Sequence, residues 1–402
     1  MKYWLLTLAA LFSLTVTAQS PVPSGLQATF PSPAAPEIEA RAYLLLDITA
    51  SNQVLASKGA DQPVEPASLT KLMTAYLAFD ALKTKKLVLD QRLPVSVRAW
   101  KMDGSRMFID PKMTVRVEDL LKGLIVQSGN DAAIAIAEGV GGSVEHFVDM
   151  MNERAKLLGM THTSYKNPEG LTVAGHTTTA QDLAILATRL MNDFPEYIGY
   201  YAMQKFRLEG SPKSNDTNRN KLLFRDSTKT GFVVDGLKTG HTDAAGYCFV
   251  VTSKRADARV GERRLLAILL GTQSEIARAN EGEKLLVWGY NAFEVIKLFD
   301  AKTVVATPRV WKGTSNEVKL GLTSGKPLVV AVPAGTNPVQ MASQIARPDP
   351  LVAPFITGQN VATLKVLINN QPWQSIPLQA LQDVASSGWL GRSWDGLRLM
   401  FH

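Results

Sequence analysis

The 402-residue sequence predicts an α/β domain, followed by a small all-β domain and a terminal amphipathic helix. Three observations support this order. Strand-like segments lie at both ends of residues 38–293 with helical segments between them, so we expect one sheet built from distant parts of the chain. After about residue 297, short strand-like runs alternate with Gly, Pro and Asn. Residues 389–402 place their apolar side chains on one helical face.

Composition narrows the class of protein. Apolar residues make up 46% and charged residues 20%, which is typical of a globular chain. The net charge of +7 is dispersed, which favours a solvated basic surface over a nucleic-acid partner. A weak attraction to anionic lipid or cell-wall polymer is the alternative. The single cysteine, Cys248, is expected in the core, and the five His residues show no ligand spacing, so we expect neither a metal nor a cofactor.

The N-terminal segment has the pattern of a secretory signal peptide over residues 1–18. A lysine precedes an apolar run that ends at Val16-Thr17-Ala18, the small residues that a signal peptidase needs. The run is short for a permanent membrane span. Residues 19–37, rich in Pro, Ser and Ala, are predicted to be a linker.

The predicted elements follow in order along the chain. A strand hairpin is expected over residues 41–61, and a helix with apolar residues at helical spacing over residues 66–82. Further helices are predicted at 118–127, 130–140, 144–159 and 179–193, strands at 234–240, 246–254 and 263–272, and a closing helix at 282–298. The β domain over residues 294–380 contains strand-like runs at 303–313, 317–335 and 362–378.

The segment 381–402 is predicted to contact a membrane surface. In a helix, one face would carry the apolar residues and the opposite face the polar residues, with Leu399 as an exception. Tryptophan on an apolar face beside a basic polar face is typical of a helix that lies in a membrane interface. The alternative is a helix docked on its own domain. The apolar set is Trp389, Leu390, Trp394, Leu397, Met400 and Phe401, and the polar set is Arg392, Asp395, Arg398 and His402.

Ser68 and Lys71 open the first predicted helix. Residues at positions i and i+3 share a helix face, so the Lys71 ammonium can reach the Ser68 hydroxyl. Serine is a weak nucleophile until a neighbour removes its proton, and a lysine can do so only when burial lowers its pKa towards neutrality. The helix N-terminus would also favour negative charge that develops at Ser68. The alternative is an N-cap serine followed by an exposed lysine.

The triplet Ser128-Gly129-Asn130 joins two predicted helices. A turn at this point would project Ser128 and Asn130 into a cleft, where Ser128 would relay a proton from Lys71 and Asn130 would bind a substrate amide. The alternative is an ordinary turn.

The triplet Lys-Thr-Gly occurs twice, at 229–231 and 238–240. The second copy ends a predicted hairpin strand, where Lys238 would face an anionic substrate group with Thr239 beside it. Its glycine has no Cβ, so a substrate backbone can approach closely. The first copy lies among turn residues, and Lys229 is therefore predicted to lie in a loop.

Together the three motifs form the S-x-x-K, S-x-N and K-T-G set of serine penicillin-recognising enzymes. The chain resembles the low-molecular-mass D-alanyl-D-alanine carboxypeptidases, the type-5 penicillin-binding proteins of peptidase family S11. The resemblance covers nearly the whole chain. It implies a catalytic domain of the α/β serine β-lactamase/DD-peptidase type, an all-β domain and an anchoring tail. The segments that carry it are EPASLTKLMTAYLAF, DGSRMF, LIVQSGNDAA, KNPEGL, NRNKLL, VDGLKTGHTDAAGYC and LLGTQSE.

The resemblance also implies roles for these residues. The substrate would be a peptidoglycan stem peptide, and β-lactams would acylate the same serine. An exported protein of this kind is expected at the periplasmic face of the inner membrane. The nucleophile would be Ser68, the general base would be Lys71 and the proton relay would be Ser128. Asn130 would orient the substrate amide, and the terminal carboxylate would be held by Lys238, Thr239 and Arg219. The backbone N–H groups of Ser68 and His241 would form the oxyanion hole.

Two segments depart from the family pattern. The stretch GSPKSNDTNRN, which contains Arg219, is longer and more polar than expected, and Glu169 occupies the loop KNPEGL. A loop glutamate invites a β-lactamase interpretation, although class A β-lactamases usually carry Asp where this chain has Gly129. The remaining alternatives are a DD-endopeptidase on the same scaffold and a non-catalytic wall-binding protein.

Overall fold

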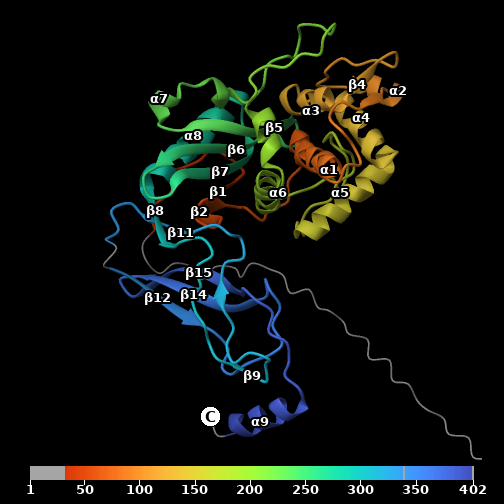
Figure 1. Ribbon diagram of the computed structural model, residues 1–402. Coiled ribbons are helices and arrows are strands. Elements are labelled where there is room, and N and C mark those ends of the chain that lie inside the picture. The colour runs from red at the N-terminus through yellow and green to blue at the C-terminus, as the bar shows by residue number, and fades with distance from the viewer. Residues whose placement is uncertain (1–31, 338–339, 401–402) are drawn as a thin grey trace, which may run out of the picture.

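The computed structural model describes residues 32–337 and 340–400 (Figure 1). The predicted signal peptide and the first part of the predicted linker lie outside the described residues, as do Phe401 and His402. The described chain forms an α/β lobe and a β-rich lobe, and the last helix lies at the end of the β-rich lobe that is remote from the α/β lobe (Figure 1).

The α/β lobe is built on a five-stranded antiparallel sheet whose strand order is β2-β1-β7-β6-β5. Strand β1 pairs with β7, so that Leu44 lies opposite Ile268, which confirms that the sheet combines distant chain segments. Alternate residues of β1 face two different cores, with Leu44 towards the helical layer and Leu45 towards α8. The strands are β1 (Ala42–Asp47), β2 (Gln53–Lys58), β5 (Val233–Thr242), β6 (Gly246–Asp257) and β7 (Gly261–Thr272).

Helices cover both faces of this sheet. Helix α1 (Lys71–Lys83) lies at the centre of the helical layer, and ten of its 13 residues are buried, which explains its nearly uniform apolar surface. Ser143 and Thr179 cap α5 and α6 by accepting bonds from backbone N–H groups three residues later. The other elements of this layer are η1 (Ala67–Thr70), α2 (Val97–Trp100), α3 (Val117–Val126), α4 (Asn130–Gly141), α5 (Val144–Leu158), α6 (Ala180–Asp193) and η2 (Pro195–Ala202), with the short strands β3 (Arg92–Pro94) and β4 (Thr114–Arg116). The turn η3 (Lys221–Phe224) packs against α8 and β5 instead.

The predicted closing helix over residues 282–298 is wrong at both ends. Helix α8 spans Glu275–Ala292 and begins after Ser274, whose side chain accepts a bond from Ala277 N–H. Residues Phe293–Phe299 form strand β8 instead, which pairs with β11 (Leu328–Pro333). The side chains of Phe293 and Val295 are buried and that of Glu294 is not, so burial alternates with the period of two that is typical of a strand. Pairing with β11 stabilises this strand in place of a helix.

The β-rich lobe contains a four-stranded sheet with the order β10-β15-β14-β12 and the pairs β8–β11 and β9–β13. Its hydrophobic core is continuous with the core beneath α8. The two lobes are also joined by Gln53 in β2, whose side-chain amide exchanges two hydrogen bonds with the backbone of Ala331 in β11, at 2.8 and 2.9 Å. Trp373 Nε1 donates to the same carbonyl. The remaining strands are β9 (Val310–Trp311), β10 (Leu320–Gly321), β12 (Met341–Ala346), β13 (Leu351–Val352), β14 (Asn360–Ile368) and β15 (Gln371–Ala380).

A buried ion pair fixes the end of α8 to the sheet. Arg263 in β7 and Asp47 in β1 are both 0% exposed, and their side chains approach to 2.7 Å. Arg263 also donates to the carbonyls of Phe293 and Gly289. The guanidinium therefore has a counter-ion and two further acceptors.

Helix α9 (Trp389–Leu399) contacts the β-rich lobe through its polar face. Asp395 Oδ2 accepts a bond from Lys312 N–H at 2.6 Å. Four of its apolar residues, Trp389, Leu390, Trp394 and Leu397, are 52–70% exposed, whereas Leu399 is half-buried. None of the helices described is both long enough and apolar enough to cross a membrane.

Candidate active site

The turn η1 carries Ser68 and leads directly into α1, whose first residue is Lys71. Lys71 is 1% exposed, whereas Ser68 is half-buried and lines a pocket of about 400 Å³. Lys71 Nζ lies 3.0 Å from Ser68 Oγ. The helical spacing therefore brings the two side chains into hydrogen-bonding contact, and the exposed-lysine alternative is excluded.

Three oxygen atoms surround the Lys71 amine. Besides Ser68 Oγ, it contacts Asn130 Oδ1 at 2.7 Å and the Glu169 carbonyl at 2.6 Å. The last two only accept hydrogen bonds. A neutral amine has two hydrogens for these acceptors, so that its lone pair is directed at Ser68. Burial lowers the pKa of Lys71 to about 7, although the Glu169 carboxylate opposes this shift. The geometry and the pKa both favour a base at neutral pH.

The turn between α3 and α4 presents Ser128 and Asn130 to the same pocket. Ser128 has φ +57° and is buried, and within the described chain its hydroxyl has no hydrogen-bond partner. Asn130 donates to the carbonyl of Asp103, which fixes its Oδ1 towards Lys71. A buried hydroxyl without a partner is costly unless a ligand or water completes it.

The carboxylate of Asp131 organises the loop that faces this turn. It accepts bonds from the backbone N–H groups of Met107, Phe108 and Ile109, and from its own neighbour Ala132. The loop DGSRMF and the turn QSGND are thus held together as one wall of the pocket.

Strand β5 forms the opposite wall and carries the second Lys-Thr-Gly triplet. Thr239 and His241 line the pocket, whereas Lys238 is buried behind it and donates to the Thr239 carbonyl at 3.0 Å. Burial lowers the pKa of Lys238 well below its ordinary value, and the nearby charge of Lys71 adds to this effect.

Two glycines press against the turn that carries Ser68. A Cβ on Gly240 would lie 3.1 Å from the Pro66 carbonyl and 3.2 Å from Leu69 N, and a Cβ on Gly170 would lie 1.9 Å from the Ala67 carbonyl. Ala67 itself has φ +48°, a strained conformation for a residue with a side chain. The glycine of the triplet therefore lets β5 approach the nucleophile turn, rather than only a substrate as the sequence suggested.

The first Lys-Thr-Gly copy lies elsewhere. Lys229 is exposed in the single helical turn α7 (Ser227–Thr230), so the predicted loop is wrong in this detail. The Asp226 side chain caps that turn by accepting a hydrogen bond from the N–H of Thr228. Lys229 does not line the pocket of Ser68.

Comparison with known proteins identifies the family. Residues 29–273 match the D-alanyl-D-alanine carboxypeptidase family, and residues 293–386 match the C-terminal domain of penicillin-binding protein 5. The chain belongs to the D-alanyl-D-alanine carboxypeptidase family.

Individual relatives of this carboxypeptidase family member cover nearly its whole length. It is 39% identical to the D-alanyl-D-alanine carboxypeptidase DacC of Escherichia coli K12, over 92% of this chain and 90% of that one. The crystal structure of penicillin binding protein 5 from Haemophilus influenzae superposes with a TM-score of 0.77 at 33% identity, covering 88% of this chain and 99% of that one. Ampicillin-bound penicillin-binding protein D2 from Listeria monocytogenes matches 64% of this chain and all of that one, at 30% identity and a TM-score of 0.56.

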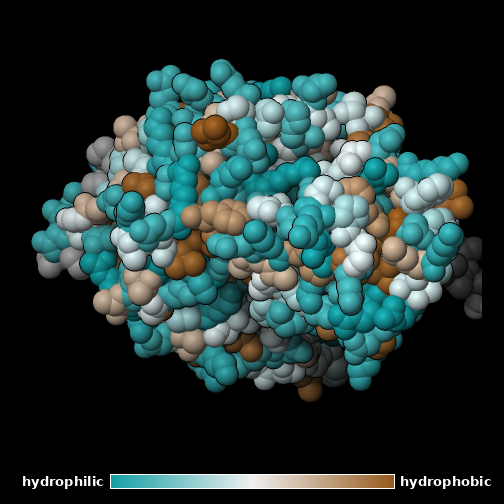
Figure 2. Space-filling view, turned by 90° about the horizontal axis from the view of Figure 1, so that it is seen from above, coloured by the Kyte–Doolittle hydropathy of each residue, from teal (hydrophilic) through white to brown (hydrophobic). Residues whose placement is uncertain are grey.

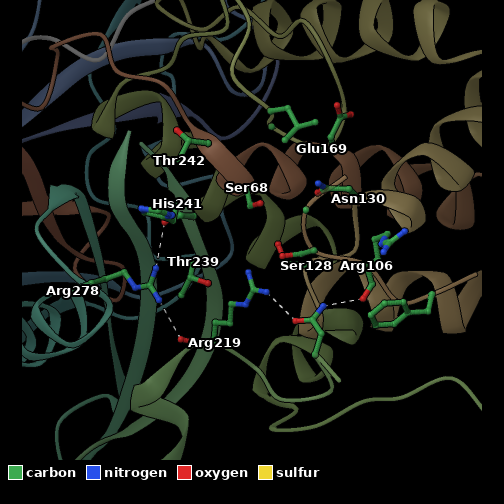
Figure 3. A pocket seen from close by; sticks show the side chains of 17 residues that line it. Ser68, Arg106, Ser128, Asn130, Glu169, Arg219, Thr239, His241, Thr242 and Arg278 are labelled. Atoms are coloured by element: carbon green, nitrogen blue, oxygen red, sulfur yellow. Dashed lines mark hydrogen bonds between the residues drawn. The ribbon is translucent and has the colours of Figure 1, made fainter. Parts of the chain in front are cut away.

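These matches establish the predicted fold class: a catalytic α/β domain and an all-β C-terminal domain. In this carboxypeptidase family member, Ser68, Ser128, Asn130, Arg219, Thr239 and His241 surround one pocket (Figure 3). The face of the molecule shown in Figure 2 is largely hydrophilic, with hydrophobic residues scattered over it.

Sequence reasoning missed Arg278, which lines the same pocket from α8. It is buried and donates to the carbonyls of Gly240 and Arg219, each at 3.3 Å. Burial lowers the pKa of Arg278 to about 10. Its only signal in the sequence is its position four residues after the helix cap Ser274, which marks a helix start and not a site.

Glu169 contributes its backbone to the site. Its carbonyl binds Lys71, its side chain is buried, and burial raises the pKa of its carboxyl. Within residues 32–337 and 340–400, no group of three or more His, Cys, Asp and Glu is arranged to hold a metal ion.

Proposed function

We propose that this protein is a serine-type D-Ala-D-Ala carboxypeptidase that removes the terminal D-alanine from peptidoglycan stem pentapeptides. The observation that carries the proposal is the buried Lys71 amine, 3.0 Å from Ser68 Oγ, with its other two contacts made to obligate acceptors. A serine beside a base of pKa about 7 is an activated nucleophile.

In the acylation step, Lys71 takes the Ser68 proton as Ser68 Oγ attacks the carbonyl carbon between the two terminal D-alanines. The backbone N–H groups of Ser68 and His241 stabilise the oxyanion of the tetrahedral intermediate. The peptide C–N bond then breaks, leaving an ester on Ser68. Free D-alanine departs with a proton delivered through Ser128, whose hydroxyl has no other partner in the described chain.

The remaining site residues hold the substrate. Asn130 orients Lys71 and the substrate amide, while Arg219, Thr239 and Lys238 supply positive charge and hydrogen bonds to the terminal carboxylate. Lys238 lies behind the pocket wall, where burial lowers its pKa; the carboxylate of a bound substrate raises that pKa again, so Lys238 contributes the field of its charge when substrate is bound. Water then hydrolyses the ester, with Lys71 again accepting a proton, and a β-lactam acylates Ser68 in place of the dipeptide.

The test is release of D-alanine from a pentapeptide that ends in D-Ala-D-Ala. Wild type should release it and Ser68→Ala should not, with the same unfolding temperature. No release with rapid penicillin hydrolysis would instead identify a β-lactamase, and cleavage only of cross-linked dimers would identify an endopeptidase. In a β-lactamase driven by Glu169, Glu169→Gln would prolong the penicilloyl-enzyme. If neither peptide nor penicillin reacts, the protein is a non-catalytic binder.

For the chain as a whole, we propose export through the signal peptide at residues 1–18 and peripheral attachment to the periplasmic face of the inner membrane. The catalytic domain spans residues 38–293 and the β domain residues 294–380, and residues 381–402 are the anchor. The support is α9, whose apolar side chains face outward while Asp395 contacts the β-rich lobe.

Deletion of residues 381–402 should release the protein from anionic vesicles without loss of D-alanine release. As a matched control, Arg392→Ser changes only the polar face and should weaken binding less than Trp389→Ser does. A truncated protein that still sediments with vesicles would contradict the anchor.

A further inference from the structure

An irregular hairpin over residues 204–218 stands beside the pocket and contains part of the long polar segment before Arg219. Its backbone pairs through Asn218 N–H to Gln204 O, at 2.8 Å, and Phe206 N–H to Asp216 O, at 2.9 Å. Asn215 lies where the hairpin meets the pocket. Its φ of +60° is a conformation that Asn tolerates better than most residues.

The side chain of Asn215 joins three separate parts of the site. Its Nδ2 donates to the carbonyls of Arg106 at 2.9 Å and Gln127 at 3.0 Å, and its Oδ1 accepts from Arg219 Nη2 at 2.9 Å. Two of these bonds are among the dashed lines in Figure 3. Because carbonyls only accept and a guanidinium only donates, the chemistry fixes the orientation of the amide. Both donors and the acceptor of Asn215 are used.

Each of these contacts leads to a residue of the site. Gln127 immediately precedes Ser128, and Arg106 belongs to the loop that Asp131 holds. Within the described chain, the two bonds from Asn215 are the only hydrogen bonds that join the hairpin to these two segments. Asn215 is therefore the point at which the hairpin is attached to the wall opposite β5.

The orientation of the Arg219 guanidinium depends on Asn215. Among the residues that the structure describes, no carboxylate forms an ion pair with its guanidinium, and Asn215 Oδ1 is the acceptor that orients it. The other N–H groups of Arg219 remain available to an anion in the pocket, which Arg219 lines. A long, flexible side chain binds more tightly when a neighbour holds it in the binding geometry.

We propose that Asn215 is a positioning residue that holds the Arg219 guanidinium where the carboxylate of a D-Ala-D-Ala peptide or a β-lactam binds. This inference rests on the proposed function, in which Arg219 binds the terminal carboxylate of the substrate. It predicts that Asn215 determines the preference of the enzyme for ligands with a free carboxylate, and that it does so through Arg219.

The test compares acylation of Ser68 by benzylpenicillin and by its methyl ester, which lacks the carboxylate. Asn215→Gly keeps the positive φ and removes the amide, so it should slow acylation by the acid roughly 10-fold or more and leave the ester rate nearly unchanged. In an Arg219→Ala background, Asn215→Gly should have no further effect on the acid. Ser214→Ala, an exposed neighbour in the same hairpin, is the control and should leave both rates unchanged.

Two results would overturn the proposal. One is an equal loss with acid and ester, which indicates a merely structural role for Asn215. The other is a full effect of Asn215→Gly when Arg219 is absent. If the glycine variant fails to fold, Asn215→Asp replaces it. This variant is isosteric, and its charge competes with the ligand carboxylate for Arg219, so an unchanged preference for the acid would also contradict the proposal.

The outcome is independent of the peptidase assay. Wild type is tested in parallel for D-alanine release from the pentapeptide. If it is acylated by benzylpenicillin but releases no D-alanine, the proposed function fails, while the comparison of acid and ester still decides the role of Asn215.

Discussion

Lys71 and Arg263 are both buried cations in the α/β lobe, but their surroundings are opposite. Arg263 has Asp47 at 2.7 Å and two carbonyls, so its charge is compensated. Lys71 has only neutral acceptors in direct contact, and its pKa falls to about 7. Burial is therefore common to a structural cation and a reactive one. Two properties distinguish them: the guanidinium of Arg263 keeps its proton and has a counter-ion, whereas the amine of Lys71 is buried without a counter-ion in contact and can lose its proton to become a base.

The largest effect should come from Lys71→Met, which removes the base and keeps an apolar side chain of similar length. Acylation of Ser68 should slow by about 100-fold to 10,000-fold, the usual contribution of a general base. The unfolding temperature should change little, because removal of a buried amine without a counter-ion offsets the loss of its hydrogen bonds to Asn130 and to the Glu169 carbonyl. Stopped-flow acylation measures the rate and thermal unfolding measures the stability. A variant that loses stability but is acylated at the wild-type rate would show that Lys71, like Arg263, is a structural cation.

Arg263→Met should show the reverse pattern. It leaves the Asp47 carboxylate buried and unpaired, which costs about 3–5 kcal/mol of stability. The folded fraction should still be acylated at the wild-type rate. The double variant with Asp47→Leu should recover part of the loss in denaturant unfolding. If Arg263→Met is as stable as wild type but inactive, Arg263 is not a structural cation.

The pH profile of acylation sharpens the same comparison. Lys71 is reactive only when neutral, so the rate should rise with pH through about 7 and level off above it. Well below that value, it should fall about 10-fold per pH unit. A rate that stays flat from about pH 5 to about pH 9 would show that Lys71 does not limit the step.

The smallest predicted effect concerns Glu169, which has the larger effect of the two carboxylates, Glu169 and Asp131, that raise the pKa of Lys71 from a distance. Ionised Glu169 raises the pKa of Lys71, against the larger effect of burial. Glu169→Gln removes this charge, so the rising limb of the profile should move to lower pH, by about one unit or less. Its backbone carbonyl still accepts from Lys71. The control Glu65→Gln alters a half-buried carboxylate that does not line the pocket and should not shift the profile.

Local patterns in the sequence were sufficient to predict the two-domain architecture and the contact of Ser68 with Lys71. Both depend on spacing within one element or on short runs of apolar residues. The predicted closing helix was wrong because Phe293–Phe299 is compatible with either a helix or a strand. Pairing with β11, whose residues lie 29 to 40 positions further along the chain, decides between the two.

The residues that sequence reasoning missed act through tertiary contacts. Arg278 lies on a helix without any motif and reaches the pocket only because α8 packs against β7 and β6, next to β5. Asp131 directly follows the S-x-N triplet, but its partners are backbone N–H groups of a loop more than twenty residues earlier. Backbone donors carry no signature in the sequence, so neither role could be predicted from it.

The close contact of Gly170 and Gly240 with the Ser68 turn has an evolutionary consequence. A larger side chain in a binding site is one way to exclude a particular ligand. At these two positions there is no room even for a methyl group without displacing the main chain beside the nucleophile. Variants with reduced drug sensitivity should therefore arise at the outer rim, on the hairpin or in the loop 103–109, where side chains can change while the nucleophile turn keeps its shape.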